Sequence, residues 1–278
     1  MNATEWALET FRKYGIEANL NNEGKIIISH YSQPKEGTFE KLGIDEDKLI
    51  ENVAACSGKF DTRNSKLTTF PLTVSQEIRL YDDTQISEMP NLKAAGILLT
   101  NKNLKKLPKL KAVGSISIEN SNIKSLPKLK EAGILIAQNS KLKELSSLKK
   151  VTKLCIIDCP IEDLKELEAA QDVFICSSDP ANKIDISALN KLEEVEKLFV
   201  ANANLKALPK LKKASKIALY NCEIKSIKHS ITKDVEIEKE ISDEKLSEKF
   251  DTFTDWYNSD VLTNSMDLLG EMVNIIKS

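Results

Sequence analysis

The sequence is poor in the residues on which most catalytic and metal sites depend. Histidine occurs only twice in 278 residues, as His30 and His229, and neither lies in a motif such as His-Glu-x-x-His. No glycine-rich phosphate loop is present. Aromatic residues make up only 5% of the chain, which favours a core of Leu, Ile, Val and Ala. We therefore expect no catalytic residue, no metal site, no cofactor and no enzymatic activity.

The sequence also lacks long apolar runs and cysteine pairs. No run approaches the ~20 apolar residues that a membrane-spanning helix needs. The start, Met1 to Trp6, has no basic segment followed by an apolar core, so it does not resemble a secretory signal. Five cysteines, with no Cys-x-x-Cys pair, indicate reduced thiols. We expect a cytoplasmic protein with no membrane span, and export by a route that needs no signal stays open.

The chain has almost no net charge, but its charges are unevenly distributed. The formal net charge is −2, so no whole-chain field favours nucleic acid or membrane. Between Leu92 and Lys233 there are 26 Lys against 15 acidic residues, whereas Asp234 to Ser278 has 12 acidic residues and 4 Lys. The middle of the chain is therefore positively charged, and its last 45 residues are acidic. Because no aromatics are interleaved with the lysines for base stacking, we do not expect nucleic-acid binding.

Leucines recur along the chain at a fixed interval. Leu110, Leu129, Leu148 and Leu167 follow one another every 19 residues, and Leu192 and Leu211 resume that interval after one longer unit. A short, fixed period of this kind is typical of a solenoid, in which each coil packs only on its neighbours.

Each unit contains a strand pattern followed by a turn. In one unit Val113, Ile116 and Ile118 occupy positions 1, 4 and 6, and their alternation predicts a strand. A short polar residue, Ser121, stands at position 9, where the chain turns. Its side chain can form hydrogen bonds with backbone groups that face inward and have no partner in the sheet. The unit closes on Leu-Pro-x-Leu, and proline's missing N–H predicts a segment that is not helical. The same pattern recurs in Val151, Leu154, Ile156, Cys159 and Ile161, and in Ala214, Ile217, Leu219, Cys222 and Ile224.

These residues carry a family resemblance. The series Val113-x-x-Ile116-x-Ile118-x-x-Ser121-x-Ile123 resembles the leucine-rich repeat, and its short unit is similar to the compact bacterial class known from secreted effectors. The resemblance covers roughly residues 49–227. It departs from the family in its unit length, in the replacement of Asn at position 9, and in Ala at position 1. It implies an α/β solenoid, a curved right-handed coil with a parallel β-sheet on its concave face, and partner binding on that face.

We expect three regions. Residues 1–48 would form a small α+β N-terminal cap, residues 49–233 the leucine-rich-repeat solenoid, and residues 234–278 a helical C-terminal cap. In the first cap we expect a helix over residues 4–14 with Thr4 as its N-cap and a hairpin around residues 21–24. We also expect helices over residues 39–42 and 45–55, the second with an acidic first turn. In the last we expect an edge strand from Val235 and then two amphipathic helices.

The candidate site is the concave face of the sheet. If positions 4 and 6 point into the core, positions 5 and 7 point to the other side, and over successive strands they are unusually apolar. We expect these positions to expose a contiguous apolar patch to solvent, which marks an interaction site, with aromatic residues as anchors. The residues that we expect to bind a partner are Ile136, Cys155, Ile157, Phe174, Cys176, Phe199, Ala218 and Tyr220.

Three functional hypotheses remain open on this sequence. The first is a non-enzymatic module that binds a protein or peptide on the concave face. The second is a secreted effector-like scaffold that also acts by binding. The third is a self-associating structural protein whose concave face is a homodimer contact. The terminal caps are a further way to cover the same patch, and a register slip of one residue at Ile134 to Ile136 would exchange its faces.

Overall fold

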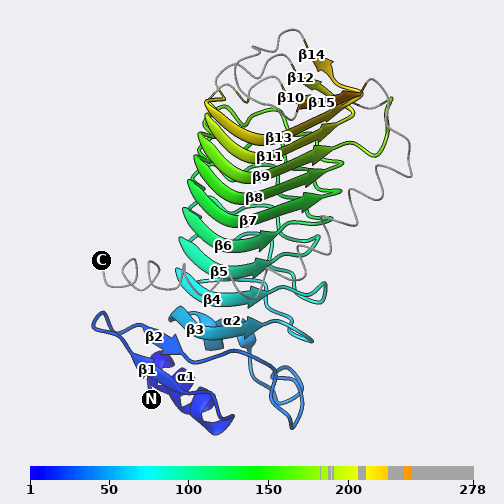
Figure 1. Cartoon of the computed structure of the whole chain (residues 1–278). Coiled ribbons are helices and arrows are strands. Elements are labelled where there is room, and N and C mark those ends of the chain that lie inside the picture. The colour runs from blue at the N-terminus through cyan, green and yellow to red at the C-terminus, as the bar shows by residue number, and fades with distance from the viewer. Residues whose placement is uncertain (182, 187–188, 190, 206–210, 225–234, 239–278) are drawn as a thin grey trace.

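The chain folds into a parallel β-solenoid with very little helix among the residues described. In this computed structural model the described residues are 1–181, 183–186, 189, 191–205, 211–224 and 235–238. Their strands form one 12-stranded sheet and one three-stranded sheet. Figure 1 shows the strands of the long sheet stacked as successive coils, with the N-terminal elements at one end.

The N-terminal region contains both described helices and one hairpin. Helix α1 (Ala3–Lys13) is capped by Asn2, whose side chain accepts a hydrogen bond from the backbone N–H of Glu5. Gly15, at φ +75°, follows the helix in the left-handed conformation typical of a helix end. Strands β1 (Ala18–Leu20) and β2 (Ile26–Ile28) then pair antiparallel. The helix and hairpin predictions are confirmed, although Asn2 rather than Thr4 caps the helix.

Of the two further helices predicted in this region, one is absent and the other is shorter than predicted. Residues 39–42 form turns rather than a helix, and Phe39 is fully buried as an anchor in the core. Helix α2 (Glu46–Ile50) has the expected acidic first turn, with Asp45 as its N-cap, but lasts only five residues rather than the predicted 45–55. It ends there because Val53 starts the first long strand, whose pairing on both sides outweighs local helix propensity.

The long sheet continues directly from the N-terminal hairpin. Strand β2 pairs in parallel with β3, so the first region is part of the same sheet and closes its first edge. The order is β1-β2-β3-β4-β5-β6-β7-β8-β9-β11-β13-β15, and every pair after the hairpin is parallel. The strands are β3 (Val53–Asp61), β4 (Val74–Arg79), β5 (Ala94–Leu99), β6 (Ala112–Ser117), β7 (Glu131–Gln138), β8 (Lys150–Ile157), β9 (Ala169–Cys176), β11 (Glu194–Ala201), β13 (Lys213–Tyr220) and β15 (Val235–Glu238).

A second, shorter sheet arises where the repeat is longest. Strands β10 (Ile184–Ile186), β12 (Ala203–Leu205) and β14 (Glu223–Ile224) pair in parallel in that order. The extra residues of the unit that begins at Leu167 lie between β9 and β10. The residues after the insertion therefore begin a second, shorter stack of parallel strands, whereas in the long sheet β9 pairs directly with β11.

The core lies inside the coils. The periodic leucines are buried, with exposures of 0–4% for Leu110, Leu129, Leu148, Leu167, Leu192 and Leu211. The Leu-Pro-x-Leu segment is not helical at Leu107 to Leu110 or at Leu126 to Leu129, as predicted. Successive coils thus stack their apolar rungs into one continuous core.

The turns after β6, β7, β8, β11 and β13 each contain a residue in the left-handed conformation. Asn120, Asn139, Asp158, Asn202 and Asn221 all have φ between 48° and 52°. Asn and Asp tolerate this conformation better than other non-glycine residues. They stand at position 8 of their units, and in four of the five units the next residue is the Ser or Cys at position 9.

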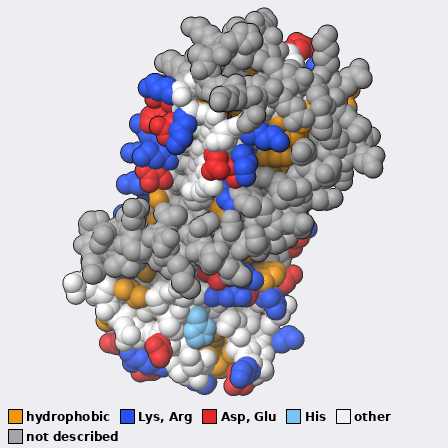
Figure 2. Space-filling model, in the orientation of Figure 1, with side chains coloured by type: hydrophobic (Ala, Val, Ile, Leu, Met, Phe, Trp, Pro, Cys, Tyr) orange, Lys and Arg blue, Asp and Glu red, His pale blue; other side chains and the backbone are white. Residues whose placement is uncertain are grey.

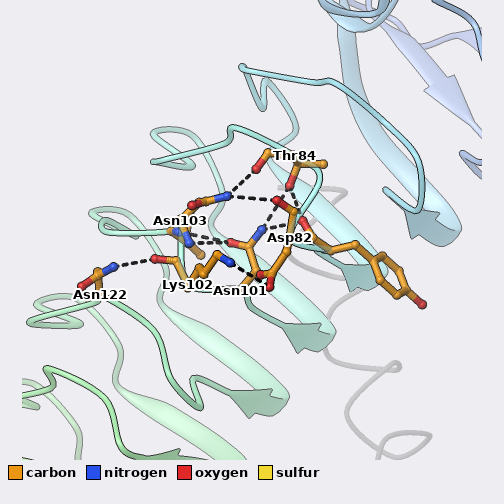
Figure 3. A network of polar contacts seen from close by, with 8 residues as sticks. Asp82, Thr84, Asn101, Lys102, Asn103 and Asn122 are labelled. Carbon is orange, nitrogen blue, oxygen red and sulfur yellow. Dashed lines mark hydrogen bonds and ion pairs between the residues drawn. The ribbon is translucent and has the colours of Figure 1, made fainter.

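Side-chain amides tie the turns of neighbouring coils together (Figure 3). Nδ2 of Asn101 donates to the backbone oxygen of Tyr81 at 2.7 Å, and Nδ2 of Asn103 donates to that of Thr84 at 2.7 Å. One coil further on, Nδ2 of Asn122 donates to the backbone oxygen of Lys102 at 2.6 Å. These bonds satisfy carbonyl groups that have no sheet partner in the turn.

The repeat prediction is confirmed as a solenoid of parallel strands. The predicted edge strand from Val235 is also present, since β15 pairs with β13 at the end of the sheet. The predicted amphipathic helices after residue 238 lie outside the described residues. No helix among those described is long and apolar enough to span a membrane.

Candidate binding face

Alternate residues of each long strand face opposite sides of the sheet. In β9, Val173 and Ile175 belong to the core of the coils. Phe174 and Cys176 belong to a separate apolar cluster on the other face. The period of two along the strand predicted this division. It also settles the register at Ile134 to Ile136, where Leu135 lies in the core and its two neighbours lie on the other side.

We call this second group the outer-face cluster. Its members come from β7, β8, β9, β11 and β13 and lie on the face that the sequence predicted to be concave. They are Ile134, Ile136, Cys155, Ile157, Phe174, Cys176, Phe199, Ala201, Ala218 and Tyr220. All eight candidate residues from the sequence are therefore brought together. Ile134 and Ala201 are additional members, and the alternation of Ile134 with Ile136 was the signal that could have identified the first.

The strand register aligns the cluster in two rows. Ile136 is the partner of Cys155, which is the partner of Phe174, and the row continues through Phe199 to Ala218. The second row runs through Ile157, Cys176, Ala201 and Tyr220. Neighbouring strands are about 4.8 Å apart, so the two rows form one continuous apolar strip across five strands.

Three aromatic rings lie at one end of this strip. The rings of Phe174 and Phe199 are stacked, with centroids 4.5 Å apart and planes inclined by 2°. The ring of Phe199 is in turn 5.3 Å from that of Tyr220, at 43°. Contacts of this geometry add to the stability gained from burial alone. The rings thus form a connected aromatic ridge over β9, β11 and β13.

The outer-face cluster is buried, and the expectation that it is exposed to solvent is wrong. Phe174 has 4% of its surface exposed and Tyr220 none, while Phe199 is half-buried. The periodicity of a strand tells which side a residue faces but not what lies on that side. Because the sequence pattern does not show what lies over this face of the sheet, the burial of the cluster was not predicted.

A row of charged residues runs beside the apolar strip. Lys153, Asp172, Lys197 and Lys216 are register partners on β8, β9, β11 and β13. Burial raises the pKa of the Asp172 carboxyl, and the nearby charge of Lys197 acts in the opposite direction. This row lies at position 3 and was not predicted, because the apolar residues that mark this face of the sheet in the sequence stand at positions 5 and 7.

The cysteines of the cluster are not built for nucleophilic chemistry. Burial raises the pKa of Cys155, and it raises that of Cys176 to about 12, whereas a reactive thiol needs a lowered pKa. Cys155 and Cys159 lie on opposite faces, one in the outer-face cluster and the other in the core. They cannot ligate one metal ion together. Within the described part of the chain, no three His, Cys, Asp or Glu side chains are grouped as a metal site.

Several lysines of the outer turns form ion pairs with acidic residues of the neighbouring coil. Nζ of Lys149 lies 3.3 Å from a carboxylate oxygen of Glu168, and Nζ of Lys212 lies 2.8 Å from one of Glu193. Figure 2 shows positive and negative side chains side by side along the edge at which the strands begin. This arrangement favours a solvated surface over a phosphate-binding one.

A second basic feature is a shallow hollow of about 630 Å³ on the outer turns. Lys105, Lys106, Lys124 and Lys141 line it, and Lys106 pairs with Glu88. The hollow contains no aromatic side chain and no buried charged group. The outer-face cluster is therefore the stronger candidate site.

Comparison of the chain with protein-family models, with curated proteins and with solved structures gave no significant match.

Proposed function

We propose that this protein is a non-enzymatic binding module of the leucine-rich-repeat type, which holds a protein or peptide partner on the outer-face cluster. The observation that carries the proposal is the aromatic ridge of Phe174, Phe199 and Tyr220. The ridge is continuous with an aliphatic strip, and both lie on the sheet face that points away from the core of the coils. Aromatic residues are favoured at the centres of protein interfaces.

The leucine-rich-repeat assignment is part of the proposal. It is supported by the 19-residue unit, by one strand in each unit of the long sheet, and by the burial of positions 1, 4 and 6. Five of its units also have a left-handed Asn or Asp at position 8. A cytoplasmic location is supported by the five thiols, all of which are free of disulfides.

The partner that this face fits is an apolar segment with an acidic border. Large apolar side chains would pack on the aliphatic strip and the ridge, and acidic groups would meet Lys197 and Lys216 at its edge. Both lysines are exposed. Electrostatic complementarity at such a rim contributes mainly to specificity and to the rate of association.

The test is a selection of displayed short peptides on the immobilised full chain. We expect selected peptides rich in apolar and acidic residues. Their binding should be lost in Phe199→Ser and retained in Lys149→Ser, a substitution of similar size on the outer turns. Peptides that bind both variants equally would contradict the proposal, because their site would then lie elsewhere.

Self-association through the same face is the competing hypothesis from the sequence. Light scattering after size-exclusion chromatography separates the two. A dimer that dissociates in Phe199→Ser would favour self-association, whereas a monomer in both forms would favour a different partner.

A further inference from the structure

The basic residues of the solenoid are concentrated on two successive coils. Residues 92–130 contain nine Lys and a single acidic residue, Glu119. The next two coils, residues 131–168, contain six Lys and seven acidic residues. On the first two coils the ammonium groups therefore far outnumber the carboxylates that could neutralise them.

The lysine-lined hollow on the outer turns lies on these two coils and on the start of the third. Its volume of about 630 Å³ falls in the range of small-molecule sites, about 300–1,000 Å³. Lys105 and Lys106 come from the first coil, Lys124 from the second and Lys141 from the third. Because neighbouring coils are about 4.8 Å apart, the four side chains start within ~10 Å of one another along the solenoid.

Three of these four lysines have no acidic partner. Lys106 lies 3.6 Å from Glu88, in an exposed pair that contributes little to stability. Lys105, Lys124 and Lys141 are exposed and form no ion pair with any residue that the structure describes. Their positive charges repel one another across the hollow, and a bound anion would offset that repulsion.

The remaining groups around the hollow also suit a phosphorylated ligand. Asn122 and Ser125 line it and are half-buried, and both side chains can donate hydrogen bonds. The Asn122 side chain is held in place because its Nδ2 donates to the backbone oxygen of Lys102 on the preceding coil (Figure 3). Lysine binds phosphate as a point charge and does not need the planar geometry that arginine requires.

Acidic residues border the hollow on both sides along the solenoid. On the N-terminal side these are Asp82 and Glu88, each paired with a lysine of the first coil. On the C-terminal side they are Glu144, which is the bridge partner of Ser125, and Glu162 on the following coil. A long polyanion that continued along the solenoid would meet these carboxylates, whereas a compact one would contact only the lysines.

We infer that the lysine-lined hollow binds a small molecule that carries a cluster of phosphate groups. The inference rests on the cavity, on three ammonium groups without acidic partners, and on the acidic borders. It concerns a different part of the surface from the outer-face cluster and does not depend on the proposed function. Phe199→Ser should therefore bind the same ligand as well as the unsubstituted chain does.

The test is isothermal titration calorimetry of the full chain with inorganic tripolyphosphate as the probe. We expect saturable binding that weakens as the salt concentration rises, because exposed charges are screened. Orthophosphate, which has one phosphate group, should bind at least about tenfold more weakly, a difference of ~1.4 kcal/mol. Absence of tripolyphosphate binding, or equal binding of the two anions, would overturn the inference.

Two paired substitutions locate the site. Lys105→Ser with Lys124→Ser removes two ammonium groups from the hollow and should weaken tripolyphosphate binding at least about tenfold. Lys111→Ser with Lys130→Ser is the matched control. It removes the same charge from two exposed lysines that lie six residues further along the same coils, and it should leave the affinity nearly unchanged. Equal weakening by the two pairs would mean that only net charge matters and would contradict a site in the hollow.

A second measurement uses the unsubstituted chain and so does not depend on the folding of any variant. Lysines are acetylated with an N-hydroxysuccinimide ester, with and without tripolyphosphate, and mass spectrometry gives the rate at each one. Tripolyphosphate should slow acetylation of Lys105, Lys124 and Lys141 and leave that of Lys111 and Lys130 unchanged. Unchanged rates in the hollow would refute the inference. A long single-stranded oligonucleotide that binds more tightly than tripolyphosphate and protects all five lysines would also refute it, because the surface would then fit a nucleic acid.

Discussion

Phe174 and Phe199 stack almost parallel across two neighbouring strands, with ring centroids 4.5 Å apart, although 25 residues separate them in the sequence. The longer repeat unit lies between them, but β9 and β11 still pair directly and place the two residues in register. The insertion has therefore been accommodated without a shift in the sheet. The stack shows that position 5 of each unit forms a continuous row, which is the basis of the proposed binding face.

The first prediction concerns the separation of the outer-face cluster from the core. Phe199 is half-buried, and its neighbour Leu198 is 1% exposed in the core. We expect Phe199→Ser to fold and to lose about 1–2 kcal/mol of unfolding free energy, mainly from lost area and the lost stack. Leu198→Ser should lose about 3–5 kcal/mol, because it leaves a cavity and buries a hydroxyl. Urea unfolding measures both, and equal losses would place Phe199 in the core.

The second prediction concerns the left-handed turn residue. Asn139 is exposed and has a φ of 49°. Asn139→Ala should cost about 1 kcal/mol, because alanine tolerates the left-handed conformation less well than asparagine does. Asn139→Gly should be near neutral, because glycine adopts positive φ without a steric penalty. Thermal unfolding of the two variants checks the difference, and a more stable Ala variant would contradict it.

The third prediction concerns the joint between the N-terminal region and the first repeat. The buried carboxylate of Glu46 accepts hydrogen bonds from the hydroxyl of Tyr31 at 2.7 Å, from Nε2 of Gln33 at 3.1 Å, and from the hydroxyl of Ser65. Tyr31→Phe should cost about 1.5–3 kcal/mol, the range for a hydrogen bond to a charged group. Tyr14→Phe is the matched control and should cost less than about 0.5 kcal/mol. Similar losses in the two variants would show that the network does not stabilise the joint.

The fourth prediction concerns the alkaline limit of stability. Burial raises the pKa of Cys176 from 9.0 to about 12, and that of Cys56 to about 11. The unfolded chain then releases these protons at lower pH than the folded chain does. Each thiol's contribution to stability is therefore complete below pH 9 and is lost as the pH rises toward the folded pKa.

The unfolding free energy of the unsubstituted chain should fall as the pH rises above 9. In Cys176→Ala this fall should be smaller by about 1.4 kcal/mol per pH unit. Urea unfolding at pH 7, 9 and 10.5 measures this slope, with Cys222→Ala at the less buried Cys222 as a comparison. An unchanged slope in Cys176→Ala would mean that this thiol ionises freely in the folded chain.

Much of the architecture was predictable because the apolar period is strict. The 19-residue interval placed Leu110, Leu129 and Leu148 on equivalent rungs, and alternation within each strand assigned the two faces. Two features depended on contacts that the local sequence does not encode. Helix α2 stops at Ile50 because β3 pairs with β2 and β4, and the burial of Phe174 depends on what lies above the sheet. The Asn or Asp at position 8 is visible in the sequence, but the left-handed conformation that it adopts was not predicted.

The most direct test of the central claim is covalent footprinting of the full chain with and without a selected peptide. A carbene reagent labels accessible side chains, and mass spectrometry locates the sites. We predict that bound peptide decreases labelling at Phe199 and at the bordering Lys197 and Lys216, and leaves labelling around Lys105 and Lys124 unchanged. Protection of the lysine-lined hollow, with unchanged labelling over β9, β11 and β13, would contradict the outer-face cluster as the binding site.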